Sequence, residues 1–226
     1  MYRSNHLTGF GGADTVKFEV THVVNTGLVV LGATANPLTV SSVNLGSFGG
    51  TKHVILGVYC NAEPGPITGV TVAGETGTII IEEGSGTAKQ TQNALVICGL
   101  TGVTSGDIVI TVQSGGYNPS KYAISVYQMT KGNATPTDTW GPDFGTTPTG
   151  TINIAAGGFC ISQASALTSS TFTWSGLTER FDSASNPSVS VAADFDMSAE
   201  TGRSITATPS GSPSQRVGIG ASFEAA

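Results

Sequence analysis

The sequence presents the same order of elements twice, first over residues 37–130 and again over residues 148–226. Each copy opens with a short alternating segment and continues with an apolar stretch that contains a cysteine, at residues 53–60 and 159–166. Each then closes on two alternating stretches separated by a turn. The repeat constrains the fold, because any set of strands that one copy forms must also suit the other. We therefore predict an internal duplication.

The chain after residue 16 has the pattern of an all-β protein. Apolar and polar residues alternate in short runs, and clusters of Gly, Pro, Asn or Ser bound nearly every run. No segment combines helical periodicity with helix-capping residues. We predict an antiparallel β-sandwich, jelly-roll-like, in which residues 13–226 form one domain and residues 131–149 cross over between the copies.

The alternation also assigns side chains to faces. Residues 53–59 and 93–100 are apolar at nearly every position, which is typical of central strands covered on both faces. Strict alternation places two further sets on one face of their strands: Val189, Val191, Ala193, Phe195 and Met197, and then Val217, Ile219, Ala221 and Phe223. Trp174 lies two residues after Phe172, so both rings project to the same side, and we predict that Trp174 is a core residue.

Composition excludes several classes of partner. The net charge is −6, and the nine Lys and Arg residues are scattered singly, which argues against a nucleic-acid surface. No stretch approaches the ~18 apolar residues of a membrane span, and the N-terminus lacks the charged-then-apolar order of a signal peptide. We expect no nucleic-acid or membrane partner and no export by the general secretory route.

The three cysteines, Cys60, Cys98 and Cys160, all lie within apolar runs. An odd number without CxxC spacing argues against a disulfide framework and against a zinc site. We predict buried free thiols that act as small apolar side chains, with one pair across a sheet as the alternative.

The sequence also lacks the motifs on which most enzymes depend. His6, His22 and His53 lie in no catalytic motif, and no G-x-S-x-G nucleophile elbow is present. We expect surface histidines, no catalytic residue and no cofactor.

Paired carboxylates occur at two places. Glu82 and Glu83 flank a predicted turn, and Asp194 and Asp196 share one face of a strand with Glu200 nearby. A weak calcium site at Asp194 and Asp196 is one interpretation, but the spacing does not match a calcium loop. We favour solvated charges at both places.

Residues 1–12 do not resemble a core strand. They combine Tyr2, Leu7 and Phe10 with Arg3 and His6 and end on glycines. One interpretation is a frayed terminus. The other, which we favour, is an extended arm that docks its apolar side chains on a neighbouring subunit, because solvated tails seldom carry so many apolar anchors.

The crossover at residues 131–149 contains three prolines and the aromatic pair Trp140 and Phe144. It either packs over one end of a sheet or contacts a partner or a glycan. Together with Tyr117, these aromatic residues form the candidate ligand loops.

Five phrases of the chain resemble a repeated β-sandwich module of tailed-phage and prophage virion proteins and of related bacterial surface proteins. They lie at residues 53–59, 69–74, 104–112, 134–139 and 173–182. The resemblance covers nearly the whole chain after the arm, but its motifs are strand edges, turns and a core tryptophan. It implies a jelly-roll-like sandwich and a structural role in a virion, and it carries over no catalytic residue.

The leading hypothesis is therefore a non-enzymatic structural protein displayed on the virion surface as a capsid decoration or fibre-like component. It implies assembly in the host cytoplasm, self-association into a homo-oligomer, and attachment through the arm to the major capsid or tail protein of the same virion. The alternative is a carbohydrate-binding module of a tail or head fibre that recognises a host surface glycan through Tyr117, Trp140 and Phe144. A glycan hydrolase is disfavoured, because no acid–base pair is evident.

Overall fold

The computed structural model describes residues 18–31, 35–48, 50–61, 65–85, 91–113, 118–144, 146–213 and 215–226. These residues form strands β1 to β18 and no helix, so the all-β prediction is confirmed for the described part of the chain. Accordingly, the described residues include no helix with the length and apolar character that crossing a membrane requires.

The strands form four antiparallel sheets, two from each half of the chain. The first central sheet contains, in spatial order, β1 (Glu19–Asn25), β10 (Lys121–Thr130), β4 (Thr51–Cys60), β8 (Thr91–Thr101) and β7 (Thr78–Ser85), with β2 (Val29–Val30) also paired to β10. The first outer sheet contains β3 (Leu38–Asn44), β9 (Ser105–Val112), β5 (Ile67–Val72) and β6 (Glu75–Thr76). The second central sheet contains β11 (Asp138–Asp143), β18 (Arg216–Phe223), β13 (Gly158–Ala166), β16 (Ser188–Met197) and β15 (Glu179–Ser183). The second outer sheet contains β12 (Thr149–Ile154), β17 (Glu200–Pro209) and β14 (Phe172–Ser175).

The two halves have corresponding strand orders. The order β1-β10-β4-β8-β7 corresponds to β11-β18-β13-β16-β15, and the order β3-β9-β5 corresponds to β12-β17-β14. The registers agree as well, since Tyr122 of β10 pairs with Cys60 and Arg216 of β18 pairs with Ala166 at the same end of each sheet. The strand pattern matches the repeat in the sequence; the duplication and the jelly-roll description stay predictions.

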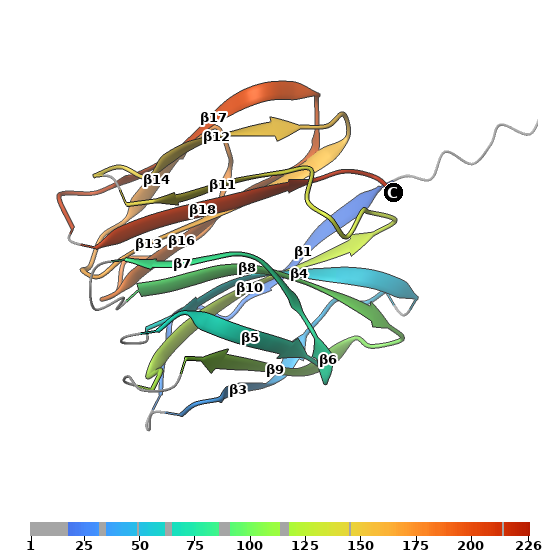
Figure 1. Ribbon diagram of the computed structural model, residues 1–226, viewed down its shortest axis with the longest axis horizontal. Helices are drawn as coiled ribbons and strands as arrows, with labels where there is room; N and C mark the ends of the chain where they lie inside the picture. The colour runs from blue at the N-terminus through green and yellow to red at the C-terminus, as the bar shows by residue number, and fades with distance from the viewer. Residues whose placement is uncertain are drawn as a thin grey trace, which may run out of the picture.

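The four sheets stack as four layers, with the two central sheets facing each other (Figure 1). One apolar cluster fills the space between the first outer and first central sheets, and two smaller clusters fill the equivalent space in the second half. A further cluster, which includes Ile55, Tyr127, Phe159 and Ile219, joins the two central sheets. The sequence predicted one sandwich shared by both copies, whereas each copy forms its own pair of sheets. The physical reason is that the central strands are apolar on both faces, so each central sheet must be covered twice.

The predicted faces agree with this arrangement at most positions. Alternate residues of β4 and β8 pack into the first sandwich and into the layer between the central sheets, as expected for strands covered on both sides. Val217, Ile219, Ala221 and Phe223 share the predicted face of β18, toward the first central sheet. Met197 does not share the face of Phe195, however, and packs into the second sandwich. Asp196 between them has a φ of 53°, which interrupts the alternation of the strand.

A buried polar network fixes the two central sheets against each other. The amide Nε2 of Gln163 donates to the carbonyl oxygen of Val58 at 2.9 Å and to Oδ1 of Asn93 at 2.6 Å. The amide Nδ2 of Asn93 donates in turn to Oγ of Ser165 at 2.7 Å. Because buried amides are costly without partners, this network favours one alignment of the two halves.

Candidate functional site

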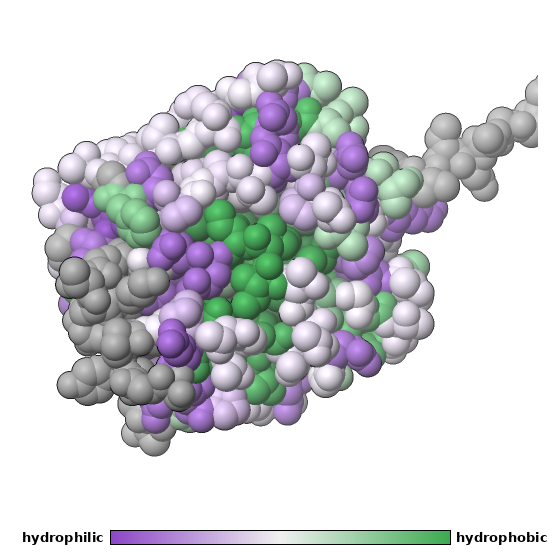
Figure 2. All heavy atoms as spheres, viewed as in Figure 1, coloured by the Kyte–Doolittle hydropathy of each residue, from purple (hydrophilic) through white to green (hydrophobic). Residues whose placement is uncertain are grey.

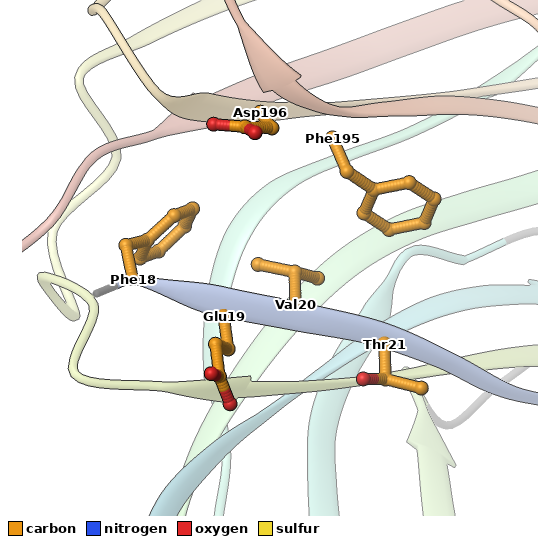
Figure 3. A pocket seen from close by; sticks show the side chains of 6 residues that line it. All are labelled: Phe18, Glu19, Val20, Thr21, Phe195 and Asp196. Carbon is orange, nitrogen blue, oxygen red and sulfur yellow. The ribbon is translucent and has the colours of Figure 1, made fainter.

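A crevice of about 310 Å3 opens at one edge of the layer between the central sheets. It is lined by residues of β1 and of the end of β16, together with the residue that precedes β1: Phe18, Glu19, Val20, Thr21, Phe195 and Asp196. Phe18 and Val20 point across the gap toward Phe195 and Asp196, whereas Glu19 and Thr21 point to the other side of β1 (Figure 3). The crevice therefore has apolar walls and a carboxylate at its rim.

Both strands that border the crevice have free edges there. β1 lies at the edge of its sheet, and its partner is β10. On the other side, β15 pairs with β16 only as far as Ala192, and the amide of Ala193 donates to the carbonyl of Thr178 at 2.9 Å. In the described part of the chain, residues 194–197 have no strand beside them on that side. Unpaired strand edges are templates for an added strand.

Aromatic rings form the interior behind the crevice. The ring of Tyr127 lies 5.0 Å from His22 and 5.5 Å from Phe159, and the ring of Phe159 stacks on Phe195 at 5.4 Å, measured between centroids. The guanidinium of Arg180 lies 5.0 Å from the centroid of the Phe195 ring. Burial raises the pKa of Tyr127 well above its ordinary value, although nearby Arg180 opposes the shift, so the phenol stays neutral. This interior is suited to packing and not to proton transfer.

The carboxylates of β16 are not arranged as a cation site. Asp194 accepts a hydrogen bond from Nη2 of Arg180 at 3.4 Å, so it is paired and not simply solvated as predicted. Asp196 is exposed. Among the described residues, no three His, Cys, Asp or Glu side chains lie close enough together to hold a metal ion.

A second groove, of about 530 Å3, lies on the other side of β1. Most of its lining is polar, and it comprises Thr21, His22, Val23, Asn44, Gly46, Ser47, Thr104 and Gln128. Part of its wall is fixed by Gln128, whose Oε1 accepts a hydrogen bond from the amide of Phe48 at 3.1 Å. Apart from Val23 the groove offers mainly hydrogen-bonding side chains, whereas Phe18, Val20 and Phe195 line the crevice, so the groove is less suited to bind an apolar segment.

Of the two interpretations of the crossover, the structure supports packing at Trp140, which therefore cannot serve as an exposed platform for a ligand. The crossover contains a strand, β11, and Trp140 within it is only 4% exposed. Its indole Nε1 donates to Oγ of Ser162 at 3.0 Å. Turn-forming Gly141 and Pro142 concealed this strand in the sequence. Phe144 is 49% exposed just after β11, and Tyr117 lies outside the described residues.

The remaining predicted residues fall into three groups. The arm residues Tyr2, Arg3, His6, Leu7 and Phe10 lie outside the described residues, which begin at Phe18 on the wall of the crevice. His22 packs against Tyr127, and burial lowers the pKa of half-buried His53, opposed by a hydrogen bond to the backbone of Gly132. The predicted side of Trp174 is confirmed: it packs beside Phe172, is half-buried and donates from Nε1 to Oγ of Ser190 at 2.8 Å.

The cysteine prediction is confirmed. Cys60, Cys98 and Cys160 are buried and form no disulfide. Burial raises the pKa of each thiol, so all three stay protonated at neutral pH.

Both outer faces of the molecule present hydroxyl groups. On the second outer sheet these side chains are exposed or half-buried and lie opposite one another across the strands: Thr149, Thr151, Thr173, Ser175, Ser204, Thr206 and Thr208. On the first outer sheet, Val109 is flanked by Thr39 and Thr71 in one cross-strand row. Such faces are polar but nearly neutral.

An apolar patch lies on the face shown in Figure 2, where β7 runs along the boundary between the two halves. β7 contributes three consecutive half-buried isoleucines, Ile79, Ile80 and Ile81. The strand is at the edge of its sheet and contacts β18 and β11. On this side the two halves are in closer contact than at the crevice.

The sequence analysis did not predict the crevice, although the residue pattern did indicate the inward face of one of its two walls. The alternation placed Phe195 on an inward face, but nothing local indicates that β1 lies opposite it, because the two segments are far apart in the chain. In comparisons with protein-family models, curated proteins and solved structures, nothing matches this chain.

Proposed function

We propose that this chain is a non-enzymatic structural protein of a tailed-bacteriophage virion, displayed on the particle surface as a capsid decoration or fibre-like component. It attaches through residues 1–12 to the major capsid or tail protein of the same virion and acts in many copies. The proposal extends the sequence resemblance.

The observation that carries the proposal is the contrast between an apolar interior and outer faces that bear hydroxyl groups and few charges. Three stacked apolar layers make a rigid body, and both outer faces carry hydroxyl groups with few charges. A rigid, nearly neutral body with free strand edges is suited to close packing on a large assembly, where charge repulsion between identical copies would be unfavourable.

The arm is the proposed anchor because its apolar side chains need a surface. Tyr2, Leu7 and Phe10 are stabilised by ~25 cal/mol per Å2 only where a neighbour covers them, whereas ordering the backbone costs ~1–2 kcal/mol per residue. A large preformed particle surface with many binding positions shifts this balance toward docking, because multiple attachments add avidity.

Deletion of residues 1–12 tests the proposal. The truncated and full-length proteins are compared for binding to particles that lack the protein, with circular dichroism to show that both are folded. We expect at least a tenfold loss of binding by the truncated protein. A full-length variant with Tyr2, Leu7 and Phe10 replaced by Ser should lose binding as well, whereas the matched variant Ser4→Ala/Thr8→Ala should not. Undiminished binding by the truncated protein would place the anchor elsewhere, on a strand edge or near Phe144.

Glycan recognition is the second candidate, and the observation that favours it is the exposure of Phe144. A flat exposed ring beside hydroxyl-bearing strands is the kind of surface that sugars stack on. The burial of Trp140 weakens this candidate, since it removes the larger platform. Loss of glycan-array binding in Phe144→Ala, with particle attachment intact, would support it.

A further inference from the structure

We infer that the crevice between β1 and β16 receives residues 1–12 of a second copy of this chain, so that two copies exchange their arms. The inference rests on the proposed function in one respect, namely that residues 1–12 act as a docking segment. It goes further because it gives that segment a second docking surface, on another copy of the chain, which the segment occupies when it is not bound to the particle.

The walls of the crevice are suited to an apolar side chain. Phe18 and Val20 on one side and Phe195 on the other are only partly buried, although they belong to the apolar layer between the two central sheets. That layer is closed at the opposite edge by β7, which contacts β18 and β11. An aromatic or leucine side chain inserted between Val20 and Phe195 would continue the layer outward.

The crevice also offers backbone groups to an extended segment. Within the described ranges, β1 is paired along one edge only, and residues 194–197 lack a neighbouring strand on the side away from β13. An extended peptide that enters here can form main-chain hydrogen bonds while alternate side chains point into the crevice. A compact partner would not satisfy these groups.

Residues 1–12 have the composition that this site requires. They contain Tyr2, Leu7 and Phe10 as apolar anchors, and they carry Arg3 without any acidic residue. The rim of the crevice bears Asp196, and the chain as a whole has a net charge of −6. The segment is therefore complementary to the crevice in both apolar character and charge.

The position of Phe18 favours a second copy over the same chain. Seventeen residues precede Phe18, and Phe18 is itself part of the crevice wall, so residues 1–12 could enter their own crevice only if the chain reversed direction within residues 13–17. Extended, those residues span up to about 60 Å, which is enough to reach the crevice of a neighbour. Two copies that exchange arms in this way form a closed, two-fold arrangement.

Sedimentation equilibrium over a range of concentrations tests the inference. We expect the full chain to form dimers and the chain without residues 1–12 to be monomeric, with at least a tenfold weaker association. Phe18→Asp should weaken the dimer similarly, and Asp196→Asn, which keeps a residue tolerant of positive φ, should weaken it less. The matched control is Phe144→Asp, an exposed phenylalanine at the opposite edge of the second central sheet, and it should leave the association unchanged. A monomeric full chain, or equal dimerisation by the truncated chain, would overturn the inference.

Disulfide trapping separates a second copy from the same chain. Leu7→Cys protein is mixed with Val20→Cys protein, since Val20 is only half-buried and points into the crevice while the native cysteines are buried (Figure 3). A covalent heterodimer is expected, and the control Thr173→Cys, on an outer face, should not form one. Crosslinking only within a Leu7→Cys/Val20→Cys chain at low concentration would show that the arm enters its own crevice, which contradicts the inference.

The two proposals fail in different measurements. If the truncated chain still binds particles but no longer dimerises, the arm-mediated attachment fails and the arm exchange holds. If the truncated chain loses particle binding while it dimerises as the full chain does, the attachment holds and the arm exchange fails.

Discussion

Each central sheet has one face that packs against the outer sheet of its own half. On this face the side chains differ in size between the first and second halves, although the strands pair in the same way. On β4 and β10 these positions are aliphatic, and on β13 and β18 they are small. The equivalent cross-strand pairs are Val58–Ile124 and Leu56–Val126 in the first half, and Ala164–Gly218 and Ser162–Gly220 in the second.

Tryptophan side chains occupy the space that the small residues leave. Trp140 lies over Gly150, Gly218 and Gly220, where an added Cβ would collide with its indole ring, and Trp174 packs against Ala164 and its neighbours. The first half fills the same space with a single cluster of branched aliphatic side chains. One strand order thus accommodates two kinds of core, provided that the summed volume is kept.

Among the substitutions that we consider, replacement of Trp140 should destabilise the second half most. Trp140→Ala leaves a cavity beside these three glycines and removes a hydrogen bond to Ser162, so we expect a loss of about 3–5 kcal/mol in the free energy of unfolding. Trp174→Ala should cost less, because Trp174 is only half-buried. Urea denaturation followed by circular dichroism measures both. A loss below about 1 kcal/mol for Trp140→Ala would mean that the second half tolerates the cavity.

The shared layer between the halves should couple their unfolding. Gln163→Ala removes the amide that binds the carbonyl of Val58 and leaves Asn93 short of a partner, so we expect a loss of about 1–3 kcal/mol. The control Gln113→Ala, at an exposed position, should change the stability by less than about 0.5 kcal/mol. Equal effects of the two substitutions would show that the network does not hold the halves together.

Asp182 on β15 should give the second half a small pH dependence. Burial raises the pKa of Asp182, although hydrogen bonds from the Phe172 backbone and from Ser190 oppose the shift. A carboxyl with a raised folded-state pKa binds its proton more tightly when folded, so its contribution to stability falls as the pH rises from the ordinary aspartate value through the raised one. The expected change is on the order of 1 kcal/mol or less, since the group is only partly buried.

Thermal or urea unfolding between about pH 3 and pH 7 measures how the free energy of unfolding depends on the protonation of Asp182. Asp182→Asn, which can still accept from the amide of Phe172, should flatten that part of the curve. An unchanged pH dependence in Asp182→Asn would assign the effect to other carboxylates.

Thiol labelling compares how readily the two halves open, and it needs no substitution. Cys60 and Cys160 occupy the central strand of each half and are completely buried, whereas Cys98 lies one strand nearer the edge. With the pKa of each thiol raised by burial, we expect slow labelling of all three in the folded protein, Cys98 first, and rapid labelling in urea. Mass spectrometry identifies the labelled sites. Labelling of Cys60 well before Cys160 would indicate that the first half opens independently of the second.

Part of the fold was predictable because its signals are local. The alternation in β18 and the apolar runs of β4 and β8 assign faces that the structure confirms. The turn-rich segment around Gly141 concealed β11, and the positive φ of Asp196 reversed the face of Met197. Both failures arise where backbone conformation departs from what the residue pattern alone implies.

For the candidate site, the sequence indicated the apolar character of the arm and of Phe195, but not the place where a crevice exists. That place depends on β1 lying opposite β16 across the layer between the central sheets. Residues so distant in the chain leave no local trace of their contact.

The sequence by itself determined that this protein is all-β and that its central strands are covered on both faces. Periodicity and turn residues act within a few positions of the chain, so they are readable directly. Only the tertiary structure decided that the covered faces meet as four stacked sheets, that Trp140 fills the second core, and that the layer between the halves stays open beside Phe18. These outcomes depend on the volumes and edges of segments that meet only after folding.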